Sequence, residues 1–255
     1  MAETRHKTAL VTGASRRIGR AIALALAADG WRVVVHYQVS EKDAQATVAD
    51  IRADGGIAEA VQADLADAAS AGGLVARAAG ALGPVSCLVN NASLFENDRM
   101  ADFTRESLGK TLEVNLIAPA LLTQALARAL PVGTPGNVIN ILDQRVWRLT
   151  PRYLSYTLSK SALWTLTRTM AMALAPVIRV NGIGPGPTLP NDQQDAAQFA
   201  RQAGSTILRR GAGLDEIAAA VRFILASPSM TGQMIALDGG QHLAWETPDI
   251  VGMED

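Results

Sequence analysis

The chain is poor in cysteine, in aromatic side chains and in excess charge of either sign. Its single cysteine, Cys87, lies in the apolar run SCLVN, which indicates a core residue, excludes a disulfide framework and favours a cytosolic protein. A net charge of −1 with no basic stripe argues against a nucleic-acid partner. No apolar run approaches the roughly 20 residues of a membrane span, and no signal peptide is visible, so we expect a cytoplasmic protein without a membrane partner.

Histidine is also scarce, and the three that occur (His6, His36 and His242) lack the spacing of metal ligands, so we expect no metal site. The chain is instead rich in apolar residues: 49% of the residues are hydrophobic and 18% are charged, which excludes a disordered protein. A length of 255 residues allows one large α/β domain or two small ones, and no linker, repeat or low-complexity tract divides the chain.

Short β-rich runs alternate along the chain with alanine-rich helical patterns. Because the runs are apolar on both faces, they are typical of buried parallel strands, and their alternation with helices predicts one doubly wound α/β domain over residues 1–255. The strands are expected at 8–12, 32–37, 57–63, 86–91, 137–142, 178–184 and 233–237. The helices are expected at 20–30, 40–56, 67–83, 111–130, 155–175 and 214–227.

Two segments have no evident place in this sheet. Residues 184–213 are rich in proline and glycine, and we expect them to form a loop with a short helix over a binding site. The tail at 241–255 is expected either to pack on a neighbouring subunit or to be mobile.

The first expected strand runs into the turn TGASRRIG, which contains Gly13 and Gly19 and precedes a helical pattern. Glycines at this position let the backbone approach a pyrophosphate, which then binds at the positive end of the helix. The alternative is an ordinary tight turn. The position directly after the first strand favours a dinucleotide site.

The end of the second expected strand bears on which dinucleotide binds. NAD sites usually place Asp or Glu here for a ribose hydroxyl, whereas this chain reads HYQVS over residues 36–40. Arg16 and Arg17 supply positive charge for a 2′-phosphate, which favours NADP(H); alternatively, Arg17 is a solvated surface charge. Asp64, after the third strand, either accepts a hydrogen bond from the adenine amino group or caps a helix.

The segment YLSYTLSKSALWTLT places Tyr156 and Lys160 four residues apart, on one face of a helix. A free tyrosine has a pKa of about 10, and a nearby ammonium lowers it, so the pair suits proton transfer during a hydride reaction. By itself this spacing is a common helix pattern. It gains weight from the dinucleotide turn and from Asp143, which ends the apolar run NVINIL 13 residues before the tyrosine.

Together, TGASRRIG, NNAS (90–93), Asn115, the Tyr156/Lys160 pair, NGIGPGP (181–187) and LDGG (237–240) resemble the short-chain dehydrogenase/reductase family over residues 6–238. The resemblance implies a Rossmann-type domain with a seven-stranded parallel sheet, a homotetramer or dimer, and NAD(P)-dependent redox chemistry. By position it implies Tyr156 as the proton donor, Lys160 as the ribose ligand that lowers the tyrosine pKa, and Asn115 as the holder of a proton-relay water.

Two residues depart from the usual pattern of the family. Arg17 stands where the turn usually has a further glycine, and Asp143 stands where a serine usually polarises the substrate carbonyl. An ionised aspartate only accepts hydrogen bonds, so it disfavours a simple ketone reductase. Pteridine and dihydromonapterin reductases within the family are similar to this chain: they combine an arginine in the turn, the aspartate, and N-A-S followed by an aromatic residue, here Phe95.

This resemblance implies an NADPH-dependent reductase of a pterin or dihydropterin, in which a ring C=N bond receives the hydride and Phe95 stacks on the pterin ring. The implied catalytic residues are Asn115, Asp143, Tyr156 and Lys160. The implied cofactor contacts are Gly13, Arg17, Ile18, Gly19, His36, Tyr37, Ser40, Asp64, Leu65, Asn91, Ala92, Ser93, Tyr156, Lys160, Pro185, Gly186 and Thr188. The implied substrate contacts are Arg17, Ser93, Phe95, Asp143, Tyr156 and Leu189.

Plainer interpretations stay open for several of these residues. HYQVS resembles the pteridine-reductase segment after the second strand, which implies that Ser40 contacts the 2′-phosphate, but Val39 stands where that segment often has a basic residue. Phe95 is alternatively a loop anchor, Ser93 a turn cap and Asp143 a helix or loop cap. Trp147, Leu149 and Leu189 either line the pocket or pack elsewhere. For the whole chain, the alternatives are a short-chain reductase of another carbonyl substrate and a low-turnover NADP(H)-binding sensor.

Overall fold

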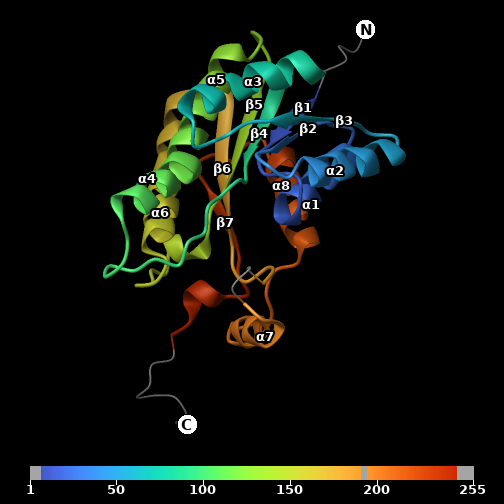
Figure 1. Ribbon diagram of the computed structural model, residues 1–255. Coiled ribbons are helices and arrows are strands. Elements are labelled where there is room, and N and C mark those ends of the chain that lie inside the picture. The colour runs from blue at the N-terminus through green and yellow to red at the C-terminus, as the bar shows by residue number, and fades with distance from the viewer. Residues whose placement is uncertain (1–6, 191–193, 246–255) are drawn as a thin grey trace.

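The computed structural model describes residues 7–190 and 194–245. Seven parallel strands form one sheet in the order β3-β2-β1-β4-β5-β6-β7 (Figure 1). The strands are β1 (Thr8–Val11), β2 (Arg32–Tyr37), β3 (Ile57–Gln62), β4 (Val85–Asn90), β5 (Gly136–Ile141), β6 (Ile178–Pro185) and β7 (Met234–Leu237). The strand order reverses between β1 and β4, which pair directly. In a doubly wound sheet, the crevice that binds ligands opens at such a reversal.

Helices cover both faces of this sheet (Figure 1). They are α1 (Arg17–Ala28), α2 (Glu41–Ala53), α3 (Ala68–Leu82), α4 (Arg105–Leu112), α5 (Ala118–Ala129), α6 (Leu154–Leu174), α7 (Ala196–Gly204) and α8 (Leu214–Ala226). α1, α2 and α8 bury one face around residues such as Ile22 and Ile217, and α3, α5 and α6 bury the other around Leu74 and Leu122. α7 lies apart from both layers, beyond the carboxyl ends of the strands.

The doubly wound α/β fold and all seven strands agree with the prediction, and each strand end lies within one residue of its expected position. α7 supplies the short helix expected within residues 184–213. In the part of the chain that the structure describes, no helix is both long and apolar enough to cross a membrane.

The single helix predicted at 111–130 is wrong. α4 already begins at Arg105, and the π-helical turn η1 (Glu113–Ile117) separates it from α5. The early start is polar: Thr104 caps α4 by accepting a hydrogen bond from the Ser107 N–H at 3.0 Å, and only Thr111 of α4 is buried. Apolar periodicity therefore carries no sign of this helix.

Candidate active site

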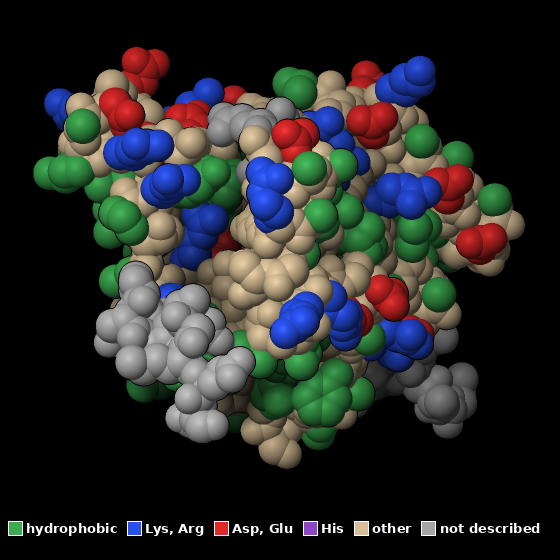
Figure 2. Space-filling model, turned by 90° about the horizontal axis from the view of Figure 1, so that it is seen from below, with side chains coloured by type: hydrophobic (Ala, Val, Ile, Leu, Met, Phe, Trp, Pro, Cys, Tyr) green, Lys and Arg blue, Asp and Glu red, His purple; other side chains and the backbone are tan. Residues whose placement is uncertain are grey.

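A cavity of about 960 Å³ opens at the carboxyl ends of the strands. The turns after β1, β4, β5 and β6 line it, together with the start of α6 and part of α7. Predicted site residues on its wall are Arg17, Ile18, Asn91, Ser93, Phe95, Asp143, Tyr156, Lys160, Pro185, Gly186, Thr188 and Leu189. Seen from the α7 end, the molecule is hollowed and Lys and Arg side chains surround the hollow (Figure 2).

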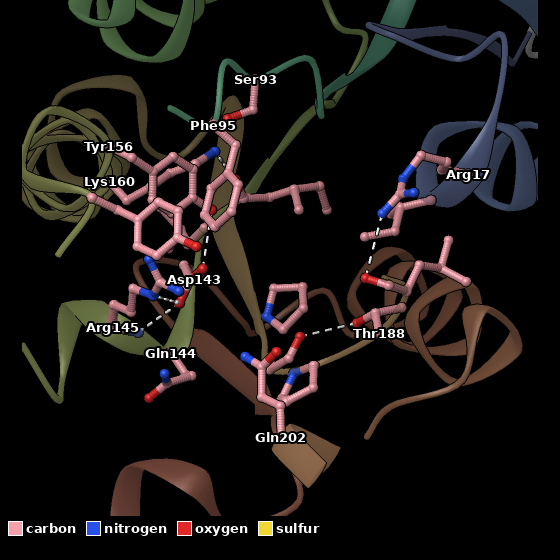
Figure 3. A pocket seen from close by; sticks show the side chains of 18 of the residues that line it. Arg17, Ser93, Phe95, Asp143, Gln144, Arg145, Tyr156, Lys160, Thr188 and Gln202 are labelled. Carbon is pink, nitrogen blue, oxygen red and sulfur yellow. Dashed lines mark hydrogen bonds and ion pairs between the residues drawn. The ribbon is translucent and has the colours of Figure 1, made fainter. Parts of the chain in front are cut away.

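Asp143, Tyr156 and Lys160 form the centre of the site (Figure 3). The Tyr156 hydroxyl donates a hydrogen bond to Asp143 Oδ2 at 3.0 Å. One helical turn further along α6, Lys160 Nζ donates to the carbonyl oxygen of Ile141 at 2.7 Å. Strand β5 therefore positions both partners of the tyrosine: its last carbonyl holds the ammonium, and the chain just beyond it carries the carboxylate.

Asp143 also caps a short helix. Its Oδ1 accepts a hydrogen bond from the backbone N–H of Arg145 at 2.8 Å and so begins the 3₁₀ helix η2 (Gln144–Val146). The two interpretations of this aspartate, as a cap and as a site residue, are therefore compatible, because each uses a different carboxylate oxygen.

Burial determines the protonation of this centre. Burial raises the pKa of Asp143, and the charge of Arg145 is the largest effect opposing that rise. The pKa of Tyr156 is raised well above its ordinary value because the phenol is buried and faces Asp143. Burial lowers the pKa of Lys160 to about 8, although Asp143 opposes this shift. The predicted lowering of the tyrosine pKa by Lys160 is therefore wrong here, since the carboxylate is the closer neighbour of the phenol.

An arginine that the sequence motifs did not reveal lies against this centre. The guanidinium carbon of Arg145 is 4.6 Å from the ring centroid of Tyr153, 5.2 Å from that of Phe95 and 5.7 Å from that of Tyr156. Phe95 stacks on Tyr153 at 4.4 Å and meets Tyr156 edge to face at 4.6 Å. Arg145 Nε also lies 3.8 Å from Asp143 Oδ1. One cation thus lies against three aromatic rings of the pocket wall and beside its acid.

The turn between β1 and α1 fits the pyrophosphate of a dinucleotide. Gly13 has a φ of +60°, and a Cβ at Gly19 would lie 2.3 Å from the Gly13 carbonyl oxygen, so glycine is required where the helix starts this close to the strand. α1 begins without a side-chain cap and without an acidic residue in its first turn. Its first backbone N–H groups are therefore available to an anion.

Arg17 occupies this turn in a strained conformation. Its φ of +56° lies in the left-handed region, which strains a non-glycine residue by about 1 kcal/mol and explains why the position usually holds glycine. Across the pocket, its Nη1 donates to the carbonyl oxygen of Pro190 at 2.9 Å (Figure 3). Arg17 therefore joins the phosphate turn to the loop after β6, and a strained residue at such a point indicates a functional side chain.

Nine predicted residues do not line the cavity: Gly13, Gly19, His36, Tyr37, Ser40, Asp64, Leu65, Ala92 and Asn115. His36 supports the glycine turn from behind, because its Nδ1 accepts a hydrogen bond from the Gly13 N–H at 3.0 Å. Burial lowers the pKa of His36 to about 4, so this side chain is neutral. Ser40 is the N-cap residue of α2, and its hydroxyl makes no capping bond. The phosphate contact of Ser40 stays a prediction.

The alternative that Asp64 caps a helix is wrong. Asp67 caps α3 by accepting a hydrogen bond from the Ser70 N–H at 2.7 Å, whereas Asp64 Oδ1 accepts from Gln38 Nε2 at 3.0 Å. The adenine contact of Asp64 stays a prediction. Ser93 is exposed, and its hydroxyl donates only to the adjacent Leu94 carbonyl, at 3.3 Å.

The predicted tail begins at the pocket. Gln241, in the 3₁₀ helix η3 (Gln241–Leu243), lies on the cavity wall, and His242 Nδ1 pairs with Asp238 Oδ2 at 2.7 Å. Trp147 and Leu149 are exposed and are not wall residues. His6 and residues 246–255 lie outside the described residues.

Asn115 lies in the π-helical turn η1 and is fully buried. Its Oδ1 accepts from the Leu94 N–H at 2.8 Å, and its Nδ2 donates to the Leu94 carbonyl and to Ser159 Oγ, both at 3.0 Å. The side chain therefore ties the loop that carries Phe95 to α6. Its predicted role in holding a relay water stays a prediction.

Residues 13–242 match the family described as enoyl-(acyl carrier protein) reductase. An uncharacterized oxidoreductase of Methylorubrum extorquens is 38% identical over 248 residues, covering 94% of this chain and 99% of that protein. The chain belongs to the short-chain dehydrogenase/reductase family.

Two further proteins are similar over nearly the whole chain. The crystal structure of FolM alternative dihydrofolate reductase 1 from Brucella suis in complex with NADP has a TM-score of 0.93 and 48% identity, covering 95% of this chain and 98% of that one. Pteridine reductase 1 of Leishmania tarentolae is 34% identical over 278 residues, covering 92% of this chain and 96% of that protein. The chain is thus an oxidoreductase of the short-chain dehydrogenase/reductase family, and its relatives are named for different substrates, among them 3-oxoacyl-(acyl carrier protein), L-rhamnose and L-xylulose.

Proposed function

We propose that the chain is an NADPH-dependent reductase of a pterin or dihydropterin. The observation that carries this proposal is Asp143 Oδ2 at 3.0 Å from the Tyr156 hydroxyl, where the family usually has a serine. An ionised carboxylate accepts hydrogen bonds and cannot donate one to a ketone oxygen. A pterin suits it better, because its ring edge presents N–H donors and a ring nitrogen that must gain a proton.

In this proposal, the Tyr156 hydroxyl gives its proton to the nitrogen of the ring C=N bond. The raised pKa of Tyr156 keeps the phenol protonated at neutral pH. The Asp143 carboxylate lies on the other side of the same hydrogen bond, and because burial raises its pKa it takes up a proton from solvent and passes it to the phenolate that forms. Lys160, held by the Ile141 carbonyl, places a positive charge near the phenolate that forms. NADPH, when bound, supplies the hydride.

Two relatives support this substrate class. A protein crystallised as an alternative dihydrofolate reductase is 48% identical to this chain, and a pteridine reductase is 34% identical. Dihydrofolate itself contains a dihydropterin ring, so both names describe reduction of the same heterocycle.

The proposed cofactor is NADP(H), with its pyrophosphate at the N-terminus of α1 and its 2′-phosphate beside Arg16, Arg17 and Ser40. The Brucella suis neighbour was crystallised with NADP. The segment from His36 to Ser40 contains no carboxylate that would repel the phosphate.

Arg17→Ala should raise the Kd of NADPH by about ten- to a hundredfold, the loss expected for a charge-assisted hydrogen bond, and leave the Kd of NADH nearly unchanged. Alanine is the suitable replacement, because it keeps the backbone strain of the φ of +56° in both proteins. Fluorescence titration with the two nucleotides measures the effect. Arg20→Ala is the matched control, since that arginine pairs with Asp50. Equal weakening of both nucleotides would mean that Arg17 shapes the turn rather than binds the phosphate.

The function itself is tested by following NADPH oxidation with dihydrobiopterin, dihydromonapterin and dihydrofolate, beside a panel of ketones and 3-oxoacyl thioesters. We expect turnover of the dihydropterins. Turnover of ketones or thioesters alone would instead identify a carbonyl reductase. Tight NADPH binding with no turnover of any compound would identify a sensor.

We also propose the homotetramer that the family resemblance implies. Exposed apolar side chains on α6 (Leu158 and Met172) and on α8 (Phe223) are suitable for contacts between subunits. Light scattering should give four times the chain mass of 26.8 kDa.

A further inference from the structure

Arg145 has guanidinium N–H donors without a hydrogen-bond acceptor in the described part of the chain. Its side chain is only 14% exposed, its Nε lies 3.8 Å from Asp143 Oδ1, and its Nη1 is buried without a hydrogen-bond partner in the described part of the chain. Buried charged donors normally have an acceptor, because leaving one unpaired is destabilising. The unpaired Nη1 therefore requires an explanation.

The surroundings of Arg145 fix its position without supplying that acceptor. The rings of Phe95, Tyr153 and Tyr156 hold the guanidinium by cation–π contacts, with its carbon 4.6 to 5.7 Å from their centroids. Asp143 and Arg145 lie on the same side of the pocket, below the rings of Phe95 and Tyr156 (Figure 3). The guanidinium is thus held next to the hydrogen bond between Tyr156 and Asp143.

None of the other charged residues on the described cavity wall supplies a hydrogen-bond acceptor for the Arg145 guanidinium, so a ligand is the remaining source of one. Among the described wall residues, Asp143 is the sole acid, and its Oδ1 lies 3.8 Å from Arg145 Nε, which is too far for a hydrogen bond. The other charged residues of the wall are cations: Arg16, Arg17, Arg152 and Lys160. Arg145 lines the cavity wall and its side chain is 14% exposed, so a bound substrate with an oxygen acceptor would pair with the part of the guanidinium that faces the cavity.

We propose that Arg145 donates a hydrogen bond to the ring oxo oxygen of the substrate and so selects 4-oxo pterins over 4-amino pteridines. This inference rests on the proposed pterin reduction. In a 7,8-dihydropterin, the imine nitrogen and the 4-oxo oxygen lie on the same edge of the fused ring. A nitrogen that faces the Tyr156 hydroxyl therefore brings the oxygen toward the guanidinium. A 4-amino group replaces this acceptor with a donor, which the cation disfavours.

Two compounds test this proposal: 6-methyl-7,8-dihydropterin and its 2,4-diamino counterpart, whose substituents differ only at position 4, where the amino group also leaves N3 without its proton. Their dissociation constants are measured by calorimetry on the protein saturated with NADP⁺. Relative to wild type, Arg145→Met should shift the ratio of the two constants toward the amino compound by about ten- to a hundredfold, the effect of a lost charge-assisted hydrogen bond. Arg145→Lys, which keeps the charge but not the planar fork, should shift it less.

The matched control is Arg148→Met, which removes an exposed arginine three residues further along the same loop and away from the cavity wall. Its ratio should equal that of wild type. The proposal is overturned if Arg145→Met and Arg145→Lys weaken both compounds alike, or if Arg17→Ala moves the ratio instead. If the wild-type protein reduces dihydropterins while the ratio does not depend on Arg145, only this inference fails. If wild type neither binds nor reduces them, the proposed function fails with it.

Discussion

Tyr156→Phe should lower kcat for dihydropterin reduction by about 100- to 10,000-fold, the usual contribution of a positioned general acid. The change removes one hydroxyl, the donor to Asp143 Oδ2 at 3.0 Å, and keeps the ring that meets Phe95 edge to face. Asp143 cannot fully substitute for the missing phenol, because its carboxyl reaches the proposed substrate nitrogen through that hydroxyl. Stopped-flow measurement of NADPH oxidation reports the loss, and fluorescence titration should show that NADPH binding weakens far less than kcat falls.

Tyr153→Phe provides the matched control for this prediction. Tyr153 lies three residues earlier on the same wall, and its ring stacks on Phe95 at 4.4 Å. Phenylalanine keeps that stack, so the variant should lose far less kcat than Tyr156→Phe. Comparable losses in the two variants would indicate that the pocket wall, and not the Tyr156 proton, limits the reaction.

The strands and motifs that could be predicted are those whose sequence pattern lies within one short segment of the chain. A buried strand appears in the sequence as a short apolar run, so β5 and Asp143, which follows it, were predicted together. The glycine turn and the spacing of Tyr156 and Lys160 are similarly local. The π-helical turn at Glu113–Ile117 was missed because one extra residue in a helix leaves the apolar pattern nearly unchanged, although it places Asn115 against Leu94.

Arg145 and Tyr153 were missed for a different reason. An arginine four residues beyond a strand resembles an ordinary surface residue, and here it is largely covered by Phe95 and Tyr153, which come from other segments of the chain. Tyr153 has a φ of +56°, a left-handed conformation that is usually indicated in a sequence by glycine, and no glycine stands beside it. The pKa of Tyr156 is raised instead of lowered for the same reason. The spacing in the sequence predicted that Lys160 and Tyr156 share one face of a helix, but it did not show that Asp143 lies closer to the tyrosine hydroxyl.

Asp143→Asn should lower kcat for dihydropterin reduction by about 100-fold or more, because it removes the titratable partner of the proton donor. Asparagine has nearly the same shape and keeps an oxygen that can accept the Tyr156 hydroxyl hydrogen bond. NADPH binding should therefore persist, as measured by fluorescence titration, and the melting temperature checks the fold. An equal loss of NADPH binding would mean that Asp143 acts only as the cap of η2, where Oδ1 accepts the Arg145 N–H.

The pH profile separates the two roles of this aspartate. Reduction requires a proton on the Tyr156–Asp143 pair, and the carboxyl, whose pKa is raised by burial, loses its proton before the phenol does. In wild type, kcat/KM should therefore fall as the pH rises through the apparent pKa of the pair. Asparagine has no such proton to lose, so in Asp143→Asn the falling limb should move to higher pH, toward the pKa of Tyr156 alone. A limb at the same pH in both proteins would assign it to another group, for which Lys160, with its pKa lowered to about 8, is the nearest candidate.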